Sequence, residues 1–435
     1  MTSLELVKAK AVPASEAVKL VHSNDTIFIG LTSNHTVDLC EALYARKDEL
    51  ENVTLLSSMI MRPTSVYTGK GAAKAFNMMT PFIGPIEKMA VKNGLPSDFT
   101  SCHLSQLDYW FRETARPNVA FMAVSMPDED GFVSLGPSGY AVYPTMLEFV
   151  DRIVLEIIPD MPYVNGSMKF NINQADAIVL STASMPIAPN PPADEMSLTI
   201  AGNILDLIPD GATIQLGLGG LSSAIGKGLK SKNNLGIYTE FFTQPMVDLI
   251  KSGNVTNKKK GFMDGKTVFA FSFGDREMYD LMDHNDEFYS ADFPFVNDAR
   301  NICRNKNMIS INTAMSINLY GEVAAEAVGY SQYSAVGGQI DFVKGSQWSE
   351  GGKSIIAMES TYEDKTGRHS KIVLNFVKGT PVTTPRSEVQ YIATEYGCVN
   401  LKALRMRDRV RAMISLAHPD FRDELTEQAK AAGIW

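Results

Sequence analysis

The strongest candidate for a chemical role is Glu240, which lies in the stretch "LGIYTEFFT" of residues 235–243. Four residues of strand-like character lead into this carboxylate, and the helix-like "QPMVDLI" follows shortly after it. Two interpretations are open. One is structural, because a negative charge near a helix N-terminus is favoured by about 0.3–1 kcal/mol. The other makes Glu240 the nucleophile of a covalent mechanism.

A glycine-rich loop lies upstream of this carboxylate, in "GLGGLSSAIGKGL" at residues 217–229. Gly217, Gly219 and Gly220 lack a Cβ atom, so their backbone N–H groups can turn toward a ligand, and the following helix N-terminus adds a positive field. A phosphate or a thioester carbonyl oxygen would suit such a loop. The spacing matches neither a P-loop nor a dinucleotide fingerprint. A purely structural turn also remains open.

A further glycine cluster lies in "AVGGQIDFVKGSQWSEGGKSIIAMES" at residues 335–360. Gly337 and Gly338 form one pair, and Gly351 and Gly352 form another just before Lys353. Paired glycines allow the backbone to approach a flat or extended ligand closely. Lys353 could neutralise a phosphate or a carboxylate, or it could be a solvated lysine at the start of a strand.

The elements that must position these residues are indicated by an internal repeat. Residues 17–31, "AVKLVHSNDTIFIGL", align without gaps on residues 204–218, "ILDLIPDGATIQLGL". Each reads as the end of a helix, a polar turn, a strand and a glycine, and a helical segment and a second strand follow in both halves. This order is typical of βαβ units in a parallel sheet. The sequence therefore predicts an α/β protein with two similar open α/β domains and mainly parallel sheets.

The boundary between the two domains is expected in "ASMPIAPNPPADEMS", residues 183–197. Its four prolines argue against a helix or a central strand. We therefore predict an N-terminal domain at residues 1–185 and a C-terminal domain at residues 186–435, the latter carrying Glu240.

The repeat also bears on the two interpretations of Glu240. When the second strands are aligned, Ser58 falls opposite Glu240. Ligands of open parallel sheets bind beyond the carboxyl ends of the strands, where both Glu240 and the glycine loop should lie. A structural carboxylate has no strong reason to occur in one half alone, so the comparison favours the nucleophile.

Composition restricts the class of function. The 435 residues carry a net charge of −9, which argues against a general nucleic-acid binder. The N-terminus resembles neither a signal nor a transit peptide, and no run of eighteen apolar residues predicts a membrane-spanning helix, so we expect a cytoplasmic protein. The four cysteines and six histidines are scattered, and no metal site is predicted.

Six motifs in order make the chain resemble a known family: "GLGGL", "YTE" ahead of "VDL", "GGQIDF", "EGGKSII", "VTTPRSEVQYIATEYGCVNL" and "LAHPDFRDEL". They are similar to the acetyl-CoA hydrolase/transferase family, especially its bacterial 4-hydroxybutyrate and butyryl-CoA:acetate CoA-transferases. The resemblance implies that Glu240 forms a glutamyl-CoA thioester. It also implies CoA contacts at Gly217, Leu218, Gly219, Gly220, Leu221, Gly337, Gly338 and Lys353.

The expected activity is transfer of CoA between a short-chain acyl-CoA and a carboxylic acid such as acetate, butyrate or 4-hydroxybutyrate, as in fatty acid metabolism. CoA would be substrate and covalent intermediate, with no permanently bound cofactor. The backbone N–H groups of Gly219 and Gly220 are the expected oxyanion donors. A homo-oligomer is implied by resemblance alone. An acyl-CoA hydrolase is the alternative with the same residues, and a non-catalytic CoA or sugar-phosphate sensor is a further one.

Overall fold

The computed structural model describes residues 3–188 and 191–435. Its contacts divide the chain into two compact units, one of Met1–Pro189 with Val268–Val296 and the other of Asn190–Thr267 with Asn297–Trp435. The sequence-based division after residue 185 falls in the same proline-rich segment but leaves residues 268–296 in the second domain. That division stays a prediction.

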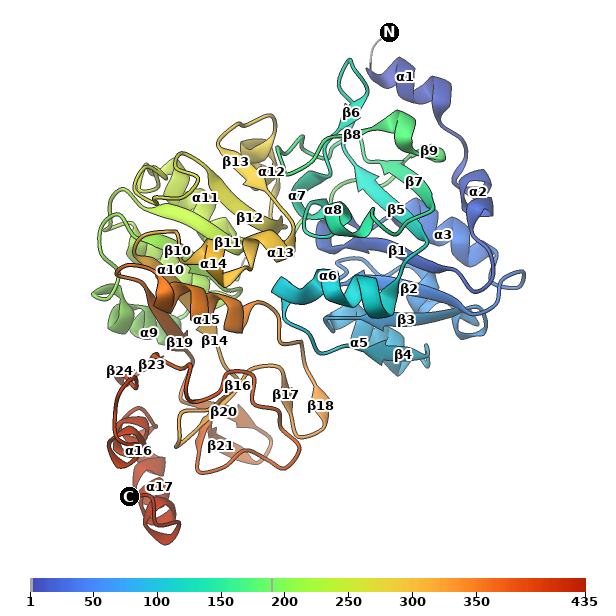
Figure 1. Ribbon diagram of the computed structural model, residues 1–435. Coiled ribbons are helices and arrows are strands. Elements are labelled where there is room, and N and C mark those ends of the chain that lie inside the picture. The colour runs from blue at the N-terminus through green and yellow to red at the C-terminus, as the bar shows by residue number, and fades with distance from the viewer. Residues whose placement is uncertain (1–2, 189–190) are drawn as a thin grey trace. The chain divides into compact units, whose positions relative to one another are not determined.

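The first unit is built on a seven-stranded sheet with the order β4-β3-β2-β1-β5-β7-β9 (Figure 1). All of its strand pairs are parallel. Every residue of β5, "VAFMAV", is buried, as expected for a strand covered on both faces. The strands are β1 (Thr26–Leu31), β2 (Val53–Ser58), β3 (Phe76–Thr80), β4 (Ser97–Phe99), β5 (Val119–Val124), β7 (Arg152–Ile157) and β9 (Ala177–Leu180).

The second sheet has eight strands in the order β13-β12-β11-β10-β14-β19-β23-β24. Strands β11, β10, β14, β19 and β23 pair in parallel, whereas β24 closes an antiparallel hairpin with β23. The strands are β10 (Thr213–Leu216), β11 (Gly236–Phe242), β12 (Thr267–Ser272), β13 (Phe288–Ser290), β14 (Met308–Thr313), β19 (Lys353–Ala357), β23 (Tyr391–Thr394) and β24 (Gly397–Asn400).

The predicted α/β class with two mainly parallel sheets is confirmed. The first strand of each repeat is a central strand, β1 in one sheet and β10 in the other, and the second strand of the repeat pairs with it, as β2 and as β11.

Most helices connect successive strands. In the second unit, α10 packs against α9 and α11, while α15 packs on β14 and β19. The helices of the first unit are α1 (Ser3–Lys10), α2 (Ala14–Ala17), α3 (Val37–Ala45), α4 (Ser65–Thr68), α5 (Pro85–Lys92), α6 (Leu107–Trp110), α7 (Gly136–Gly139), α8 (Tyr143–Met146), α12 (Arg276–Met282) and α13 (Phe293–Val296). Those of the second are α9 (Glu195–Leu205), α10 (Gly220–Leu229), α11 (Gln244–Lys251), α14 (Ala299–Ile302), α15 (Gln339–Trp348), α16 (Met406–Ser415) and α17 (Pro419–Ala431).

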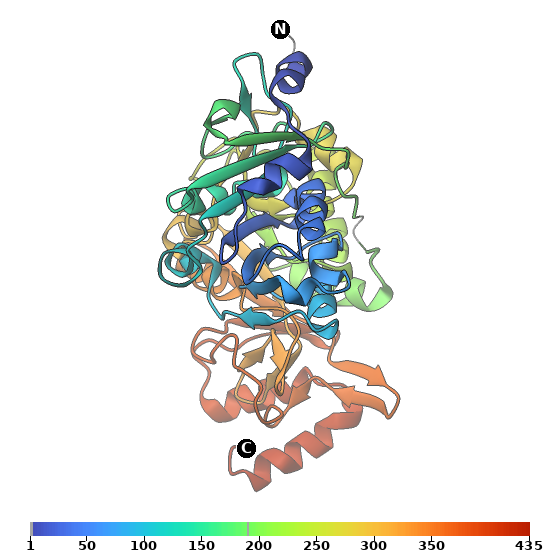
Figure 2. The same cartoon turned by 90° about the vertical axis from the view of Figure 1, so that its right-hand side faces the viewer.

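The second unit ends in a smaller region of short strands and two helices. Figure 2 shows α16 and α17, in red, beside the orange hairpin of β20 and β21. Both helices bury an apolar stripe, with Val410, Met413 and Ile414 on α16 and Leu425 and Ala429 on α17. The short strands here are β15 (Ser316–Asn318), β16 (Val323–Ala324), β17 (Ala327–Val328), β18 (Ser331–Gln332), β20 (Thr361–Asp364), β21 (Gly367–Ser370) and β22 (Ile372–Val373), and the first unit adds β6 (Phe132–Val133) and β8 (Phe170–Asn171).

One local expectation was wrong. The proline-rich segment 183–197 was not expected to be helical, but α9 begins at Glu195. All of the prolines precede this point, and the Asp194 side chain accepts a hydrogen bond from the backbone N–H of Ser197. An aspartate at the N-cap favours the start of a helix. A helix can therefore begin inside this segment, shortly after its last proline. Among the described residues, no helix is long and apolar enough to cross a membrane.

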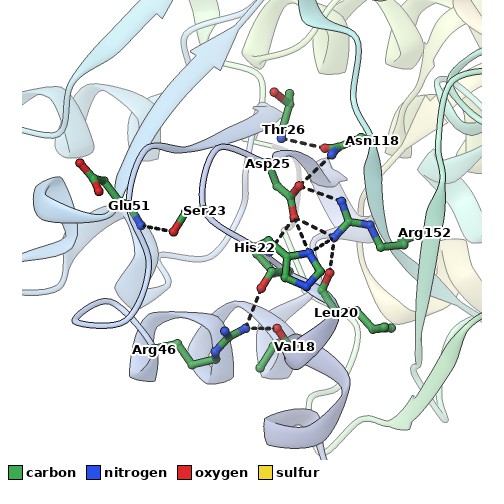
Figure 3. A network of polar contacts seen from close by, with 11 residues as sticks. Val18, Leu20, His22, Ser23, Asp25, Thr26, Arg46, Glu51, Asn118 and Arg152 are labelled. Atoms are coloured by element: carbon green, nitrogen blue, oxygen red, sulfur yellow. Dashed lines mark hydrogen bonds and ion pairs between the residues drawn. The ribbon is translucent and has the colours of Figure 1, made fainter.

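A polar network fixes the turn that leads into β1 (Figure 3). The guanidinium of Arg152 donates to the Asp25 carboxylate, with Nη2 and Oδ1 2.7 Å apart. The side chain of Asn118 and the backbone N–H of His22 donate to the same carboxylate, each at 2.7 Å. Burial alone would raise the pKa of Asp25, but these donors outweigh it and lower the pKa below its usual 3.8. The network therefore joins the entry of β1 to β5 and β7.

Replacing Asp25 by alanine should lower the free energy of unfolding by about 1–3 kcal/mol, because Arg152 and Asn118 would lose their shared acceptor. The stabilisation from Asp25 is present above the carboxyl's unfolded pKa and is lost as the pH falls through the lowered folded value. Urea unfolding at pH 7 measures the effect. The control is Glu49→Ala, which removes an exposed partner of Arg46. Equal stability of the two variants would contradict the structural role of Asp25.

Candidate active site

Glu240 lies within strand β11, close to its carboxyl end. Helix α11 begins only at Gln244 and has Thr243 as its N-cap, so Glu240 is outside the first turn of that helix. The residue is partly exposed, whereas its neighbours Thr239 and Phe241 are buried. The structure thus places a reachable carboxylate at the edge of the sheet where ligands of parallel sheets bind.

Three residues far away in sequence surround the Glu240 carboxylate. The side-chain amide of Asn297 donates to Glu240 through Nδ2, which is 2.6 Å from Oε2. The backbone N–H of Gly338 donates to the same carboxylate. The same Nδ2 atom of Asn297 lies 3.5 Å from Oδ2 of Asp341, which is in the first turn of α15. One oxygen of Glu240 is therefore held by donors, with a second negative charge close behind them.

Gly338 touches the carboxylate so closely that no side chain fits there. A Cβ atom at this position would lie 1.8 Å from Glu240 Oε2 and 2.0 Å from Asn297 Nδ2. Its neighbour Gly337 has a positive φ of 61°, and a Cβ atom there would meet open space. The two positions of "GGQIDF" thus need glycine for different reasons. Gly337 allows the turn, and Gly338 allows the contact with Glu240.

The pKa of Glu240 is raised from its usual 4.5 to about 7. Burial is the largest cause, because removal from water disfavours the charged form, and the negative charge of Asp341 acts in the same direction. The hydrogen bonds from Asn297 and Gly338 favour the carboxylate and limit the rise. At neutral pH a substantial fraction of Glu240 is ionised, and the ionised form is a stronger nucleophile than an ordinary surface carboxylate.

The glycine loop ends β10 and opens α10 at the carboxyl edge of the same sheet. Gly219 is the N-cap residue and has φ of 104° and ψ of −174°, a conformation open essentially to glycine alone. A Cβ atom on Gly220 would lie 3.1 Å from the carbonyl oxygen of Pro192. The other predicted CoA contacts of this loop are Gly217 and Leu221, which are partly exposed, and Leu218, which is exposed.

Lys353 is not brought to this edge. It is the first residue of β19 and pairs with Ile309 near the start of β14, at the amino end of the sheet. The residue is partly exposed, and its Nζ lies 3.5 Å from the carbonyl oxygen of Gly351. A CoA contact at Lys353 stays a prediction, and the structure separates this lysine from the Glu240 carboxylate.

Asn297 and Asp341 were missed in the sequence. Asp341 stands in the motif "GGQIDF", so its place next to a glycine pair was a usable signal. Asn297 precedes the short helix α14 and belongs to no motif. It becomes recognisable only because the fold brings it against Glu240.

The described partners of the Glu240 carboxylate are Asn297, Gly338 and Asp341, none of which is a cysteine or a histidine. Cys40 is buried, and burial raises the pKa of its thiol well above the usual range. Among the described residues, no group of three or more His, Cys, Asp or Glu side chains could hold a metal ion. The arrangement is suited to attack by a carboxylate on an activated carbonyl, with hydrogen-bond donors already in place.

Comparison with known proteins identifies the family to which the chain belongs. Residues 6–189 match the acetyl-CoA hydrolase/transferase N-terminal domain, and residues 274–429 match the C-terminal domain of the same family. The chain belongs to the acetyl-CoA hydrolase/transferase family. It is a CoA-transferase of that family and uses CoA as a substrate.

Individual relatives cover the full length. The butyryl-CoA:acetate CoA-transferase of Anaerostipes caccae is 35% identical over 100% of this chain and 99% of its own. The 4-hydroxybutyrate coenzyme A transferase of Clostridium kluyveri is also 35% identical, over 98% of both chains. The crystal structure of RipA from Yersinia pestis superposes with a TM-score of 0.90 and 30% identity, over 100% of both chains.

Gly338→Ala should reduce kcat at least a hundredfold, because its methyl group would displace the Glu240 carboxylate or the Asn297 amide by an ångström or more. The measurement is CoA transfer between an acyl-CoA and acetate, together with the unfolding temperature. Gly337→Ala is the matched control: it strains a positive-φ turn by roughly 1–2 kcal/mol but leaves the carboxylate contact intact. The assignment fails if the Gly338 variant transfers CoA as well as the Gly337 variant does.

Glu240→Gln should make the protein more stable at pH 8 and leave it nearly unchanged near pH 4.5. Between the unfolded pKa of 4.5 and the folded value of about 7, only the folded protein keeps the proton, so stability falls as the pH rises. Above about pH 7, Glu240→Gln should therefore raise the free energy of unfolding by about 1–3 kcal/mol. Thermal unfolding across this pH range tests it, with Glu129→Gln on an exposed turn as control. A pH-independent difference would contradict the raised pKa.

Proposed function

We propose that this CoA-transferase moves CoA between a short-chain acyl-CoA and a carboxylic acid such as acetate, through a glutamyl-CoA thioester on Glu240. The observation that carries the proposal is the Glu240 carboxylate itself, partly exposed at the sheet edge and held by Asn297 and Gly338. The names of the two relatives support butyryl and 4-hydroxybutyryl groups, with acetate as partner acid, as the first substrates to test.

The first half-reaction begins with Glu240 attacking the thioester carbonyl carbon. The tetrahedral intermediate collapses to an acyl-glutamyl anhydride, and CoA leaves as a thiolate. The thiolate then attacks the glutamyl carbonyl carbon, the anhydride C–O bond breaks, and the carboxylate product leaves. The enzyme is left with CoA joined to Glu240 as a thioester. A second carboxylate runs the same steps backward, so no general base is needed.

Two kinds of oxyanion form along this route. When the glutamyl carbonyl is attacked, negative charge develops on an oxygen of Glu240, the group to which Asn297 and Gly338 already donate. When the acyl carbonyl is attacked, charge develops on the substrate, and the N–H groups at Gly219 and Gly220 are the proposed donors. Loss of one such donor typically costs about 2.7–4 kcal/mol in the barrier.

The covalent intermediate provides the test. Mixed with butyryl-CoA alone, the protein should release butyrate and gain the mass of one CoA less one water per chain, as intact-protein mass spectrometry measures. Hydroxylamine should then modify the peptide containing "TEFFTQ" and abolish transfer, and it should do neither without acyl-CoA. Glu240→Gln, which keeps the size of the side chain, should give no adduct.

The same experiment separates the alternatives. Addition of labelled acetate should convert the adduct into acetyl-CoA, whereas release of free CoA thiol in place of acetyl-CoA would make the protein a hydrolase. A modification on a cysteine, or wild-type rates in Glu240→Gln, would defeat the proposed role of Glu240.

A further inference from the structure

One side-chain amide lies between two carboxylates at the candidate active site. Nδ2 of Asn297 is 2.6 Å from Oε2 of Glu240 and 3.5 Å from Oδ2 of Asp341. These two carboxylate oxygens are therefore at most about 6 Å apart, a distance at which like charges shift one another's pKa. A side-chain amide nitrogen carries two hydrogens, so Asn297 can direct one toward each carboxylate.

The two carboxylates have different surroundings. Asp341 is buried in the first turn of the ten-residue helix α15, where the helix N-terminus favours a negative charge. Glu240 lies on strand β11, where burial disfavours its charge and raises its pKa to about 7. The negative charge of Asp341 contributes to this rise. Since the surroundings of Glu240 favour its neutral form and those of Asp341 favour a charge, Glu240 is the member of the pair that gains from becoming neutral.

The first half-reaction under "Proposed function" removes the charge from Glu240. The Glu240 carboxylate ends as an uncharged thioester of CoA, and the negative charge leaves with the carboxylate product. A bond to sulfur at the carboxyl carbon and a proton on the carboxylate oxygen have this loss of charge in common. Repulsion by a fixed neighbouring charge should therefore favour both. The group that raises the pKa of Glu240 should also favour the thioester over the free enzyme.

The same carboxylate pair bears on the orientation of the Asn297 amide. Within the described residues, Oδ1 of Asn297 is buried and has no hydrogen-bond partner, so the acceptors near Nδ2 fix the orientation. When Glu240 becomes a thioester, its oxygen is a weaker acceptor than a carboxylate, whereas Asp341 keeps its charge. Turning the amide over would place Oδ1 against that charge. Nδ2 therefore stays directed at the glutamyl oxygen, where the oxyanion forms in the next attack.

We propose that Asp341 drives formation of the covalent intermediate. Its charge destabilises the free Glu240 carboxylate, and its Oδ2 keeps the Asn297 amide directed at Glu240 after that charge has gone. Asp341 is a positioning residue, because it acts through Glu240 and Asn297. The inference rests on the proposed function, since it needs Glu240 as the nucleophile.

Asp341→Asn tests the role of the charge, because it removes the charge and keeps the shape of the side chain. At about 6 Å and effective dielectric constants of about 80 to 20, the repulsion corresponds to about three- to a hundredfold in an equilibrium constant. The variant should lower the midpoint of the Glu240 titration by about 0.5–2 pH units. By the same factor, it should reduce the equilibrium constant that converts enzyme and butyryl-CoA into adduct and butyrate.

Two independent measurements give these quantities. Carbon-13 NMR of protein labelled at the glutamate carboxyl carbons gives the Glu240 titration, and Glu240→Gln identifies its signal. Intact-protein mass spectrometry gives the adduct fraction at fixed ratios of butyryl-CoA to butyrate, at about pH 9, where Glu240 is ionised. A merely structural role of Asp341 would not change both quantities by one common factor.

Glu350→Gln is the matched control, because it removes a negative charge from an exposed residue beyond the end of α15. The helix from Asp341 to Trp348 is about 10 Å long, about one Debye length, so this variant should change neither measurement. Asp341→Glu keeps the charge and should stay closer to the wild type than Asp341→Asn does. Asp341→Ser is a second uncharged variant and should repeat both shifts.

The proposal is overturned if the uncharged variants leave the Glu240 titration or the adduct fraction unchanged, or if the two quantities change by different factors. Its failure can be told from that of the proposed function. If Glu240 were not the nucleophile, the wild type would form no adduct with butyryl-CoA. If only the role of Asp341 were wrong, the wild type would form the adduct on Glu240 and Asp341→Asn would form the same fraction of it.

Discussion

The contact between the Glu240 carboxylate and the backbone of Gly338 constrains the residue types and the elements in the rest of the site. It requires a residue without Cβ at the start of α15, because a methyl group would lie 1.8 Å from a carboxylate oxygen. It requires β11 to deliver Glu240 at the edge of the sheet, and it requires α15 to lie over the same face. The amide of Asn297 completes the contact from a separate segment. Sheet, helix and loop are thus held to one geometry by a single carboxylate.

The two halves of the internal repeat differ at the start of the helix that follows their first strand. In the first unit, the buried Glu156 on β7 accepts hydrogen bonds from the first backbone amides of α3, those of Val37, Asp38 and Leu39. The strand registers of the two sheets put Ala357 on β19 at the position of Glu156. Alanine offers no carboxylate, so the start of α10 is not closed in this way. This difference is compatible with the proposed role of Gly219 and Gly220 as oxyanion donors.

The sequence was sufficient for the features that depend on local pattern. The apolar run "NVAFMAVS" at residues 118–125 forms β5, Val119–Val124, since a continuous apolar run between turns leaves few other structures. Glu240 and the glycine pair at Gly338 were also recognisable from their motifs. Asn297 was not, because its role depends on a tertiary contact between segments 57 residues apart. Lys353 was grouped with them by motif, but it begins its strand, and strand direction puts it at the amino end of the sheet.

The neighbours of Glu240 act against one another, and the balance suits the chemistry. Burial and the charge of Asp341 raise the pKa, while Asn297 and Gly338 lower it, and the result is about 7. With more donors the carboxylate would be fully ionised but a weaker nucleophile, because nucleophilicity falls with pKa. With fewer, it would be protonated at neutral pH and unable to attack. In the proposed mechanism the same donors would stabilise the oxyanion formed when the glutamyl carbonyl is attacked, so groups that reduce the ground-state reactivity of Glu240 would also lower the later barrier.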